Sequence, residues 1–399
     1  MSIPSSLGQR SVASANPVHM EMETKKFSRQ EPLTKDTLLA LSVDLEELVA
    51  RGPSWQLKEV DEFTHRIKRL KTLDLGLTRR VLPSNLLTEV LNANKLIKNL
   101  IVPDSNIDAS GLNSLSPLTE SLNIKGCDYL SPDDVINFLS KSSQIKEVRL
   151  NRSLATAKVA EAIANHCPQL EILDFSEAVG ISETSYLKIA RKCPGLKEIF
   201  FYYSENFSDL VLTEFLEKCK ELTKIHAANT NVTDIFLYKI GHLNRAIKKI
   251  DLSYCKNITR DGLEALLKVS KDSLENLLVG GVEMDLWMID LLSTYHPPLT
   301  WFSFKSIKDY GIHPRASVLL KIIGELSCPV PRIQEINITN FSNVDYNVLT
   351  KLIDLCGTIK VVYANRQQIW DFAESQGLGQ EEEPFQKKFE DEFGVKILL

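Results

Sequence analysis

The 399-residue sequence contains no long hydrophobic run and no block of basic residues. A membrane-spanning helix needs about 20 consecutive apolar residues, so we expect no membrane association. Residues 1–31 lack an apolar stretch typical of a secretory signal, and we predict that they form a disordered N-terminal tail. The formal net charge of −5 argues against nucleic acid as the main partner.

The sequence also lacks the short motifs of common cofactor sites. It has no phosphate-binding G-x-x-x-x-G-K-[ST], no dinucleotide-binding G-x-G-x-x-G and no zinc-binding H-E-x-x-H. None of the seven cysteines has the C-x₂₋₄-C spacing of a zinc site, so we interpret them as buried free thiols. We therefore expect no cofactor and no metal, and a reducing compartment: the cytoplasm, with the nucleus or a host cytosol (for a bacterial effector) as alternatives.

What the sequence does contain is a leucine-rich pattern, L-x-x-L-x-L, that returns about every 26 residues. Such a repeat predicts a solenoid, in which each unit buries its apolar residues only against its neighbours. The twelve starting positions are Leu70, Ile97, Thr119, Ile145, Leu170, Leu196, Leu222, Ile247, Leu274, Leu299, Ile333 and Ile359.

The unit that starts at Ile247 shows how one repeat is built. Alternating apolar and polar residues predict a strand with Ile250 and Leu252 inside and Asp251 outside. Cys255 then occupies a tight corner, and Thr259 begins a helix whose first-turn amides its side chain can cap. Stacked units predict an α/β leucine-rich-repeat solenoid of about twelve repeats over residues 67–365: a curved horseshoe with a parallel sheet on its concave face and helices on its convex face. Small residues fill the equivalent corners at Thr78, Ser105, Cys127, Ser153, Ala178, Ser204 and Thr230.

The residues from Ile247 to Leu263, and those from Cys167 to Leu173, resemble the cysteine-containing leucine-rich repeats of F-box/leucine-rich-repeat proteins. The resemblance rests on L-x-x-L-x-L-x-x-C, I-T-x-x-G-L and C-P-x-L. It implies that the curved domain captures a substrate protein, and that a preceding F-box docks an adaptor of a ubiquitin ligase.

An F-box is not recognisable in this chain. Residues 32–66 lack its Leu-Pro opening, and we predict a helical N-terminal cap there, including a helix from Thr37 to Val49, or a diverged docking segment for the adaptor. Leu82 and Pro83 resemble an F-box opening, but they lie where a repeat helix is due, and a helix is the favoured interpretation.

Two other segments depart from the repeat. Extra residues at 305–331 predict a protruding loop, either a surface insertion or part of the binding face. Residues 366–399 are predicted to form a C-terminal cap and acidic tail, with a capping helix at Gln367–Glu374 and a solvated linker at Glu381–Pro384. The apolar end, Val395–Leu399, either packs on the last coil or acts as a docking peptide.

The outward positions of the strands define a candidate surface for a protein partner. The pair Phe200 and Tyr202 is its most unusual feature, because exposed aromatics beside mixed charge are typical of interface hot spots. The alternative is that these rings only fill space against each other. The candidate partner-binding residues on the concave face are Arg149, Asp174, Phe200, Tyr202, Lys224, His226, Lys249, Asp251, Trp301 and Lys305.

Neighbouring strands should also bring His226 beside Asp251, with Ser253 close by. This resembles a catalytic triad, but a regular sheet offers no oxyanion hole, and we expect no enzyme. The favoured function is protein recognition by a monomer, as the substrate receptor of a ubiquitin ligase of the F-box type. The alternative is a scaffold, effector or regulatory protein with no link to a ligase.

Overall fold

The computed structural model describes residues 24–27, 40–50, 61–75, 84–280 without 151, 179, 205 and 244, 291–303 without 293 and 296, 335–337, and 346–399 without 357 and 380. The inserted residues 305–331 and the site candidate Lys305 lie outside these ranges. So does the side chain of Trp301, although its backbone belongs to a described strand.

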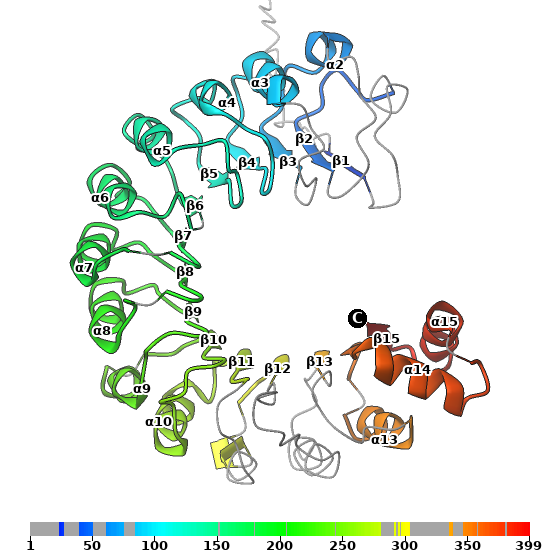
Figure 1. The fold of residues 1–399 in the computed structure, drawn as a ribbon. Helices are drawn as coiled ribbons and strands as arrows, with labels where there is room; N and C mark the ends of the chain where they lie inside the picture. Colours follow the sequence, from blue (N-terminus) through cyan, green and yellow to red (C-terminus); the bar gives the residue numbers. More distant parts are fainter. Residues whose placement is uncertain are drawn as a thin grey trace, which may run out of the picture.

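The described strands form one parallel sheet of fifteen strands, ordered as they occur in the chain. This sheet lines the inner side of an open arc (Figure 1). The strands are β1 (Thr24–Phe27), β2 (Glu47–Ala50), β3 (Thr72–Asp74), β4 (Asn99–Ile101), β5 (Ser121–Asn123), β6 (Glu147–Arg149), β7 (Ile172–Asp174), β8 (Glu198–Phe200), β9 (Lys224–His226), β10 (Lys249–Asp251), β11 (Asn276–Leu278), β12 (Trp301–Ser303), β13 (Glu335–Asn337), β14 (Val361–Tyr363) and β15 (Lys396–Leu398).

The helices follow the strands and occupy the outer side of the arc (Figure 1). Among those the structure describes, none is both long and apolar enough to cross a lipid bilayer. They are α2 (Asp61–Arg66), α3 (Ser84–Ala93), α4 (Ala109–Asn113), α5 (Pro132–Leu139), α6 (Ala157–His166), α7 (Glu183–Lys192), α8 (Asp209–Lys218), α9 (Asp234–His242), α10 (Arg260–Ser270), α13 (Tyr346–Cys356), α14 (Arg366–Ser375) and α15 (Glu382–Phe393).

The predicted leucine-rich-repeat solenoid is confirmed. Each of the strands from β3 to β14 begins two residues after one of the predicted repeat starts. Helix α3 covers the segment after Pro83, which confirms a repeat helix there. Because successive strands pair residue for residue, their middle residues stack into one apolar column. Its fully described members from β2 to β14, each at most 1% exposed, are Leu48, Leu73, Leu100, Leu122, Val148, Leu173, Ile199, Ile225, Ile250, Leu277 and Val362.

Side chains at the helix starts connect neighbouring coils. Ser131, Ser182 and Thr233 each accept a hydrogen bond from a first-turn amide, as a helix cap does. The capping role predicted for Thr259 is wrong, since its hydroxyl makes no such bond. Instead, its amide and hydroxyl both donate to the carboxylate of Asp234 in the preceding coil, at 2.9 and 2.5 Å. These two bonds connect the start of α10 to the preceding coil.

The cysteines form inter-coil contacts at two places. Cys193 and Cys219 each place Sγ 3.4–3.5 Å from the carbonyl of the cysteine one coil earlier. Cys127 and Cys255 occupy corners, where each Sγ lies 3.2 Å from a carbonyl of the preceding coil. These four and Cys167 are free and buried, as predicted, whereas the side chains of Cys328 and Cys356 lie outside the described residues.

A second row of corner residues has a left-handed backbone that the sequence did not reveal. In seven successive coils the residue three places after the last strand residue has a positive φ, between 21° and 72°. Two of the seven are tyrosines with exposed side chains, Tyr203 and Tyr254. One predicted corner is wrong, because Ser153 is exposed and Leu154 is the buried residue. The row consists of Asp104, Gly126, Arg152, Glu177, Tyr203, Asn229 and Tyr254.

The sheet extends past both predicted ends of the repeat region. Residues 24–27, predicted to be disordered, form β1, and the segment predicted as a helix from Thr37 to Val49 ends in β2. Buried Leu48 and Ala50 alternate with partly exposed neighbours, which is the period of a strand. Leu48 pairs with Leu73 of β3, so this segment belongs to the sheet and not to a helix.

At the other end, α14 covers the predicted capping helix. The linker predicted at Glu381–Pro384 is wrong, because these residues begin α15, which buries Phe385 and Phe389. The apolar end of the chain forms β15 and pairs with β14, so it packs on the last coil.

Candidate functional site

The concave face carries one continuous row of side chains from the last residue of each strand. Asp74, Ile101, Asn123, Arg149, Asp174, Phe200, His226, Asp251 and Leu278 occupy register-matched positions on β3 to β11. Eight of the ten candidate residues lie together on β6 to β10 or, for Tyr202, two residues after β8, and these eight define the candidate site. The structure does not describe the side chains of the other two, Trp301 and Lys305.

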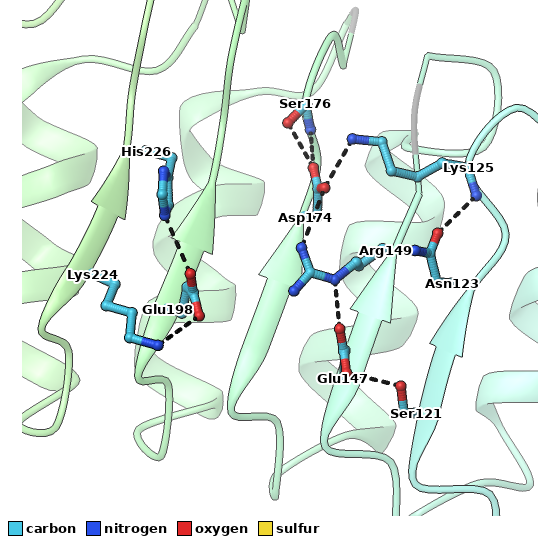
Figure 2. A network of polar contacts seen from close by, with 10 residues as sticks. All are labelled: Ser121, Asn123, Lys125, Glu147, Arg149, Asp174, Ser176, Glu198, Lys224 and His226. Carbon is cyan, nitrogen blue, oxygen red and sulfur yellow. Dashed lines mark hydrogen bonds and ion pairs between the residues drawn. The ribbon is translucent and has the colours of Figure 1, made fainter. Parts of the chain in front are cut away.

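One half of this site is an acid–base network centred on Asp174 (Figure 2). Asp174 accepts hydrogen bonds from the amide and hydroxyl of Ser176, at 3.0 and 2.6 Å, and from Lys125 Nζ at 2.8 Å. Arg149 lies across it, with Nη1 3.8 Å away and Nε bonded to Glu147. Asp174 is therefore the buried centre of the network, and only 3% of the residue is exposed.

The other half is an aromatic stack. The rings of Phe200 and His226 are parallel, with centroids 4.1 Å apart, and the Arg149 guanidinium lies 4.6 Å from the Phe200 centroid. Tyr202 places its hydroxyl 2.9 Å from His226 Nδ1, and Glu198 lies 3.2 Å from His226 Nε2. Arg149 thus connects the stack to the network, and the cation over a ring face adds favourable electrostatics.

These contacts change the acidity of two side chains. Burial opposes ionisation of Glu198, but its hydrogen bonds with His226 and Lys224 outweigh burial and lower its pKa to about 2. Burial, together with the negative charges of Asp251 and Asp174, raises the pKa of Tyr202. Glu198 therefore remains a carboxylate and Tyr202 a neutral phenol throughout the physiological range.

The lowered pKa of Glu198 predicts a pH-dependent contribution to stability. Since the folded value of about 2 lies below the ordinary 4.5, the contribution is complete above pH 4.5 and is lost as the pH falls toward 2. We expect Glu198→Gln to lower the free energy of unfolding by at most about 3 kcal/mol near neutral pH and by less at acid pH. Urea unfolding at both pH values measures this, with the exposed Glu374→Gln on α14 as control. An equal loss at both pH values would contradict it.

The structure corrects the exposure expected for two site residues. Asp174 and Asp251 were predicted to face the partner, but they are only 3% and 6% exposed. Asp174 is covered because the longer side chains of Lys125 and Arg149 fold across it. Asp251 accepts a hydrogen bond from the amide of Ser253, two residues on. Both aspartates therefore lie beneath the surface that a partner would contact.

Sequence reasoning missed Lys125 and Ser176 as parts of the site. Each lies two residues beyond the end of a strand and, by the alternation of a strand, on the same face as the central row. That rule already selected Tyr202 after β8, and applied to β5 and β7 it would have found both residues. Tyr202 and Phe200 also contact each other, with centroids 6.2 Å apart, so they fill mutual space as well as facing the concavity.

The triad suggested by His226, Asp251 and Ser253 is not assembled. His226 directs its two ring nitrogens at Tyr202 and Glu198. Ser253 uses its hydroxyl to accept the amide of Gly280, 3.2 Å away. Among the residues that the structure describes, no group of three or more His, Cys, Asp or Glu side chains is arranged to hold a metal ion.

Comparisons with known proteins agree with this architecture, although no family model matches the sequence. A stretch of 209 residues is 26% identical to the F-box/TPR repeat protein pof3 of Schizosaccharomyces pombe. The match covers 50% of this chain and 35% of the relative, so the chain spans about a third of the relative's length.

Two solved structures are similar at lower sequence identity. One is the complex of yeast Rad7 and Elc1, with a TM-score of 0.54 and 16% identity, covering 82% of this chain and 78% of that one. The other is an internalin, inlF, from Listeria monocytogenes, with a TM-score of 0.44, 15% identity and 80% of each chain covered. The repeat pattern and the parallel sheet define a leucine-rich-repeat protein, and the likeness in fold to the Rad7 and Elc1 complex agrees with that class.

Proposed function

We propose that this protein is a non-enzymatic recognition module that holds a partner protein on its concave face, over β5 to β10. The observation that carries the proposal is the stack of Arg149, Phe200 and His226, which is held in place by neighbouring strands. A surface fixed before binding loses little side-chain entropy on association. Aromatic and arginine side chains are also the groups that dominate interface energies.

A link to ubiquitin ligation is the more specific proposal. Its support is the similarity to pof3, an F-box protein by name, and the likeness in fold to a protein solved together with Elc1. The segment 32–66 would dock the adaptor, and the reducing environment suited to five free thiols favours action in the cytoplasm or nucleus. The alternative, a scaffold, effector or regulatory protein, shares the concave site but binds no adaptor.

Affinity capture with the full chain tests the recognition site. We expect the double variant Phe200→Ala, Tyr202→Ala to capture no partner, because both aromatic rings are removed from the concave face. Their contacts with His226 mean that the pair also lowers stability by about 1–2 kcal/mol, so folding is checked by thermal unfolding. Tyr129→Ala with Tyr238→Ala is the matched control, since both tyrosines are exposed elsewhere. A partner retained equally by both double variants would disprove the site.

The ligase link needs a separate measurement with purified components. The full chain is required, because β1 and β2 pair within the same sheet as the repeats. A fragment ending near residue 66 would separate these two strands from β3 and the rest of the sheet. Binding to a purified adaptor of the F-box type, or to Elc1, is expected if the chain is a substrate receptor. If neither binds while the concave partner does, the scaffold alternative stands.

A further inference from the structure

The charged side chains of the candidate site are unequally exposed. The side chain of Lys125 is 31% exposed and that of its partner Asp174 is 4% exposed. Lys224 and Glu198 show the same order, at 36% and 14%. The side chains of Arg149 and Glu147 are similarly exposed, at 22% and 24%. Because the acids lie below the bases, a molecule entering the concavity meets mostly ammonium and guanidinium groups, although the whole chain has a net charge of −5.

Several of these cations retain hydrogen-bonding capacity. The Nε of Arg149 donates to Glu147, while Nη1 lies at ion-pair distance, 3.8 Å, from Asp174. A guanidinium has five N–H donors, so the fork of Arg149 can still receive a carboxylate. Lys249 is a first-position residue on β10, beside Lys224 on β9. Within the described part of the chain, Lys249 forms no ion pair.

The neighbouring aromatic residues offer an apolar contact. Phe200 and Tyr202 are both partly exposed, and one face of Phe200 lies against His226. The hydroxyl of Tyr202 already contacts His226 Nδ1, which leaves the edge of its ring for a guest. Arg149, Lys224 and Lys249 therefore lie on the same run of strands, β6 to β10, as the aromatic rings of Phe200 and Tyr202.

We infer that the guest is a short acidic segment of a partner protein, in which a carboxylate adjoins an apolar or aromatic side chain. Its carboxylates would bind Arg149, Lys224 and Lys249, and its apolar group would contact Phe200 and Tyr202. This inference rests on the proposed function and adds the chemistry of the partner.

A nucleic acid suits this surface less well. Its binding draws on several cations that neutralise successive phosphates. Here the bases Lys125, Arg149, Lys224 and Lys249 are matched in number by the acids Glu147, Asp174, Glu198 and Asp251. One or two carboxylates can use the exposed donors, whereas a polyphosphate chain would also approach the acids beneath them.

Selection from a phage-displayed library of random peptides, with the full chain as bait, tests this chemistry. We expect enrichment of peptides with Asp or Glu beside aromatic or aliphatic residues. A synthetic peptide from the selection should bind each single variant, Lys249→Glu or Arg149→Gln, about tenfold more weakly than it binds the wild type. Its affinity for the wild type should fall with added salt. Lys249→Glu is the cleaner variant, since it breaks no described ion pair. Arg191→Glu on the outer helix α7 is the control and should leave binding unchanged.

The outcomes separate this inference from the proposed function. Enrichment of basic or uncharged peptides that still require Phe200 and Tyr202 would overturn the acidic segment and leave the recognition site standing. Peptides that bind the double alanine variant as well as the wild type would refute the site itself. Failure to enrich any peptide, or displacement of the peptide by a single-stranded RNA oligonucleotide, would also overturn the inference.

Discussion

Leu252→Asp is expected to lower the free energy of unfolding by more than about 4 kcal/mol, enough to unfold a typical domain in part. Leu252 is fully buried directly after β10, between neighbouring coils on both sides. The substitution removes apolar burial, leaves a cavity and places a carboxylate in the apolar interior. Urea unfolding followed by circular dichroism gives the loss.

Because each coil contacts only its neighbours, the damage should spread along the arc. Hydrogen exchange should show lost amide protection from β8 to β11, and not only in β10. Leu252→Met, which conserves volume, should cost less than about 1.5 kcal/mol. Lys256→Asp adds the same carboxylate at an exposed position of this coil and should be nearly neutral. An unfolding curve of Leu252→Asp that matches the wild type would refute the continuous apolar core.

The five buried thiols are expected to be inert in the folded protein and to react together when it unfolds. Burial raises the pKa of Cys127 to about 11 and those of Cys167 and Cys219 to about 12, and it also raises those of Cys193 and Cys255. Because the thiolate is the reactive species, a pKa of about 12 leaves roughly one thiol in ten thousand reactive near pH 8.

A chromogenic disulfide reagent measures this in a Cys328→Ser, Cys356→Ser background. We expect reaction at least about 100-fold slower than that of a free thiol in the native state, and rapid reaction of all five in denaturing urea. Leu210→Cys, at a position 56% exposed on α8, supplies a reactive control. Fast reaction of any native thiol would show that its coil opens locally.

The repeat pattern was sufficient to predict the central architecture, because every coil of a solenoid has the same local order of strand, corner and helix. An apolar residue at every second position, as in Ile250 and Leu252, sets both strand and register. The ends were harder, since terminal coils depart from the consensus. Leu45, Leu48 and Ala50 fit a helix as well as a strand by spacing alone, and only pairing with β3 decides. The start of α15 was hidden because three glutamates suggested solvated chain, whereas Phe385 and Phe389 anchor it.

For the candidate site, the sequence predicted which side chains share a face but not how deep each one lies. Depth depends on the lengths of neighbouring side chains in three dimensions. Arg149 reaches across Asp174 to Phe200, two strands away, and no pattern within one strand contains that information. The same holds for the pairing of His226 with Glu198 rather than with Asp251.

The left-handed corner row has a consequence for how this protein can change over evolutionary time. In seven coils the distance from strand to corner is constant, while the helices behind vary from five residues in α4 to eleven in α10. Insertions and deletions can therefore accumulate on the outer circumference without moving the inner one. Descendants of this sequence could exchange one guest for another by replacing side chains on an unaltered backbone lattice.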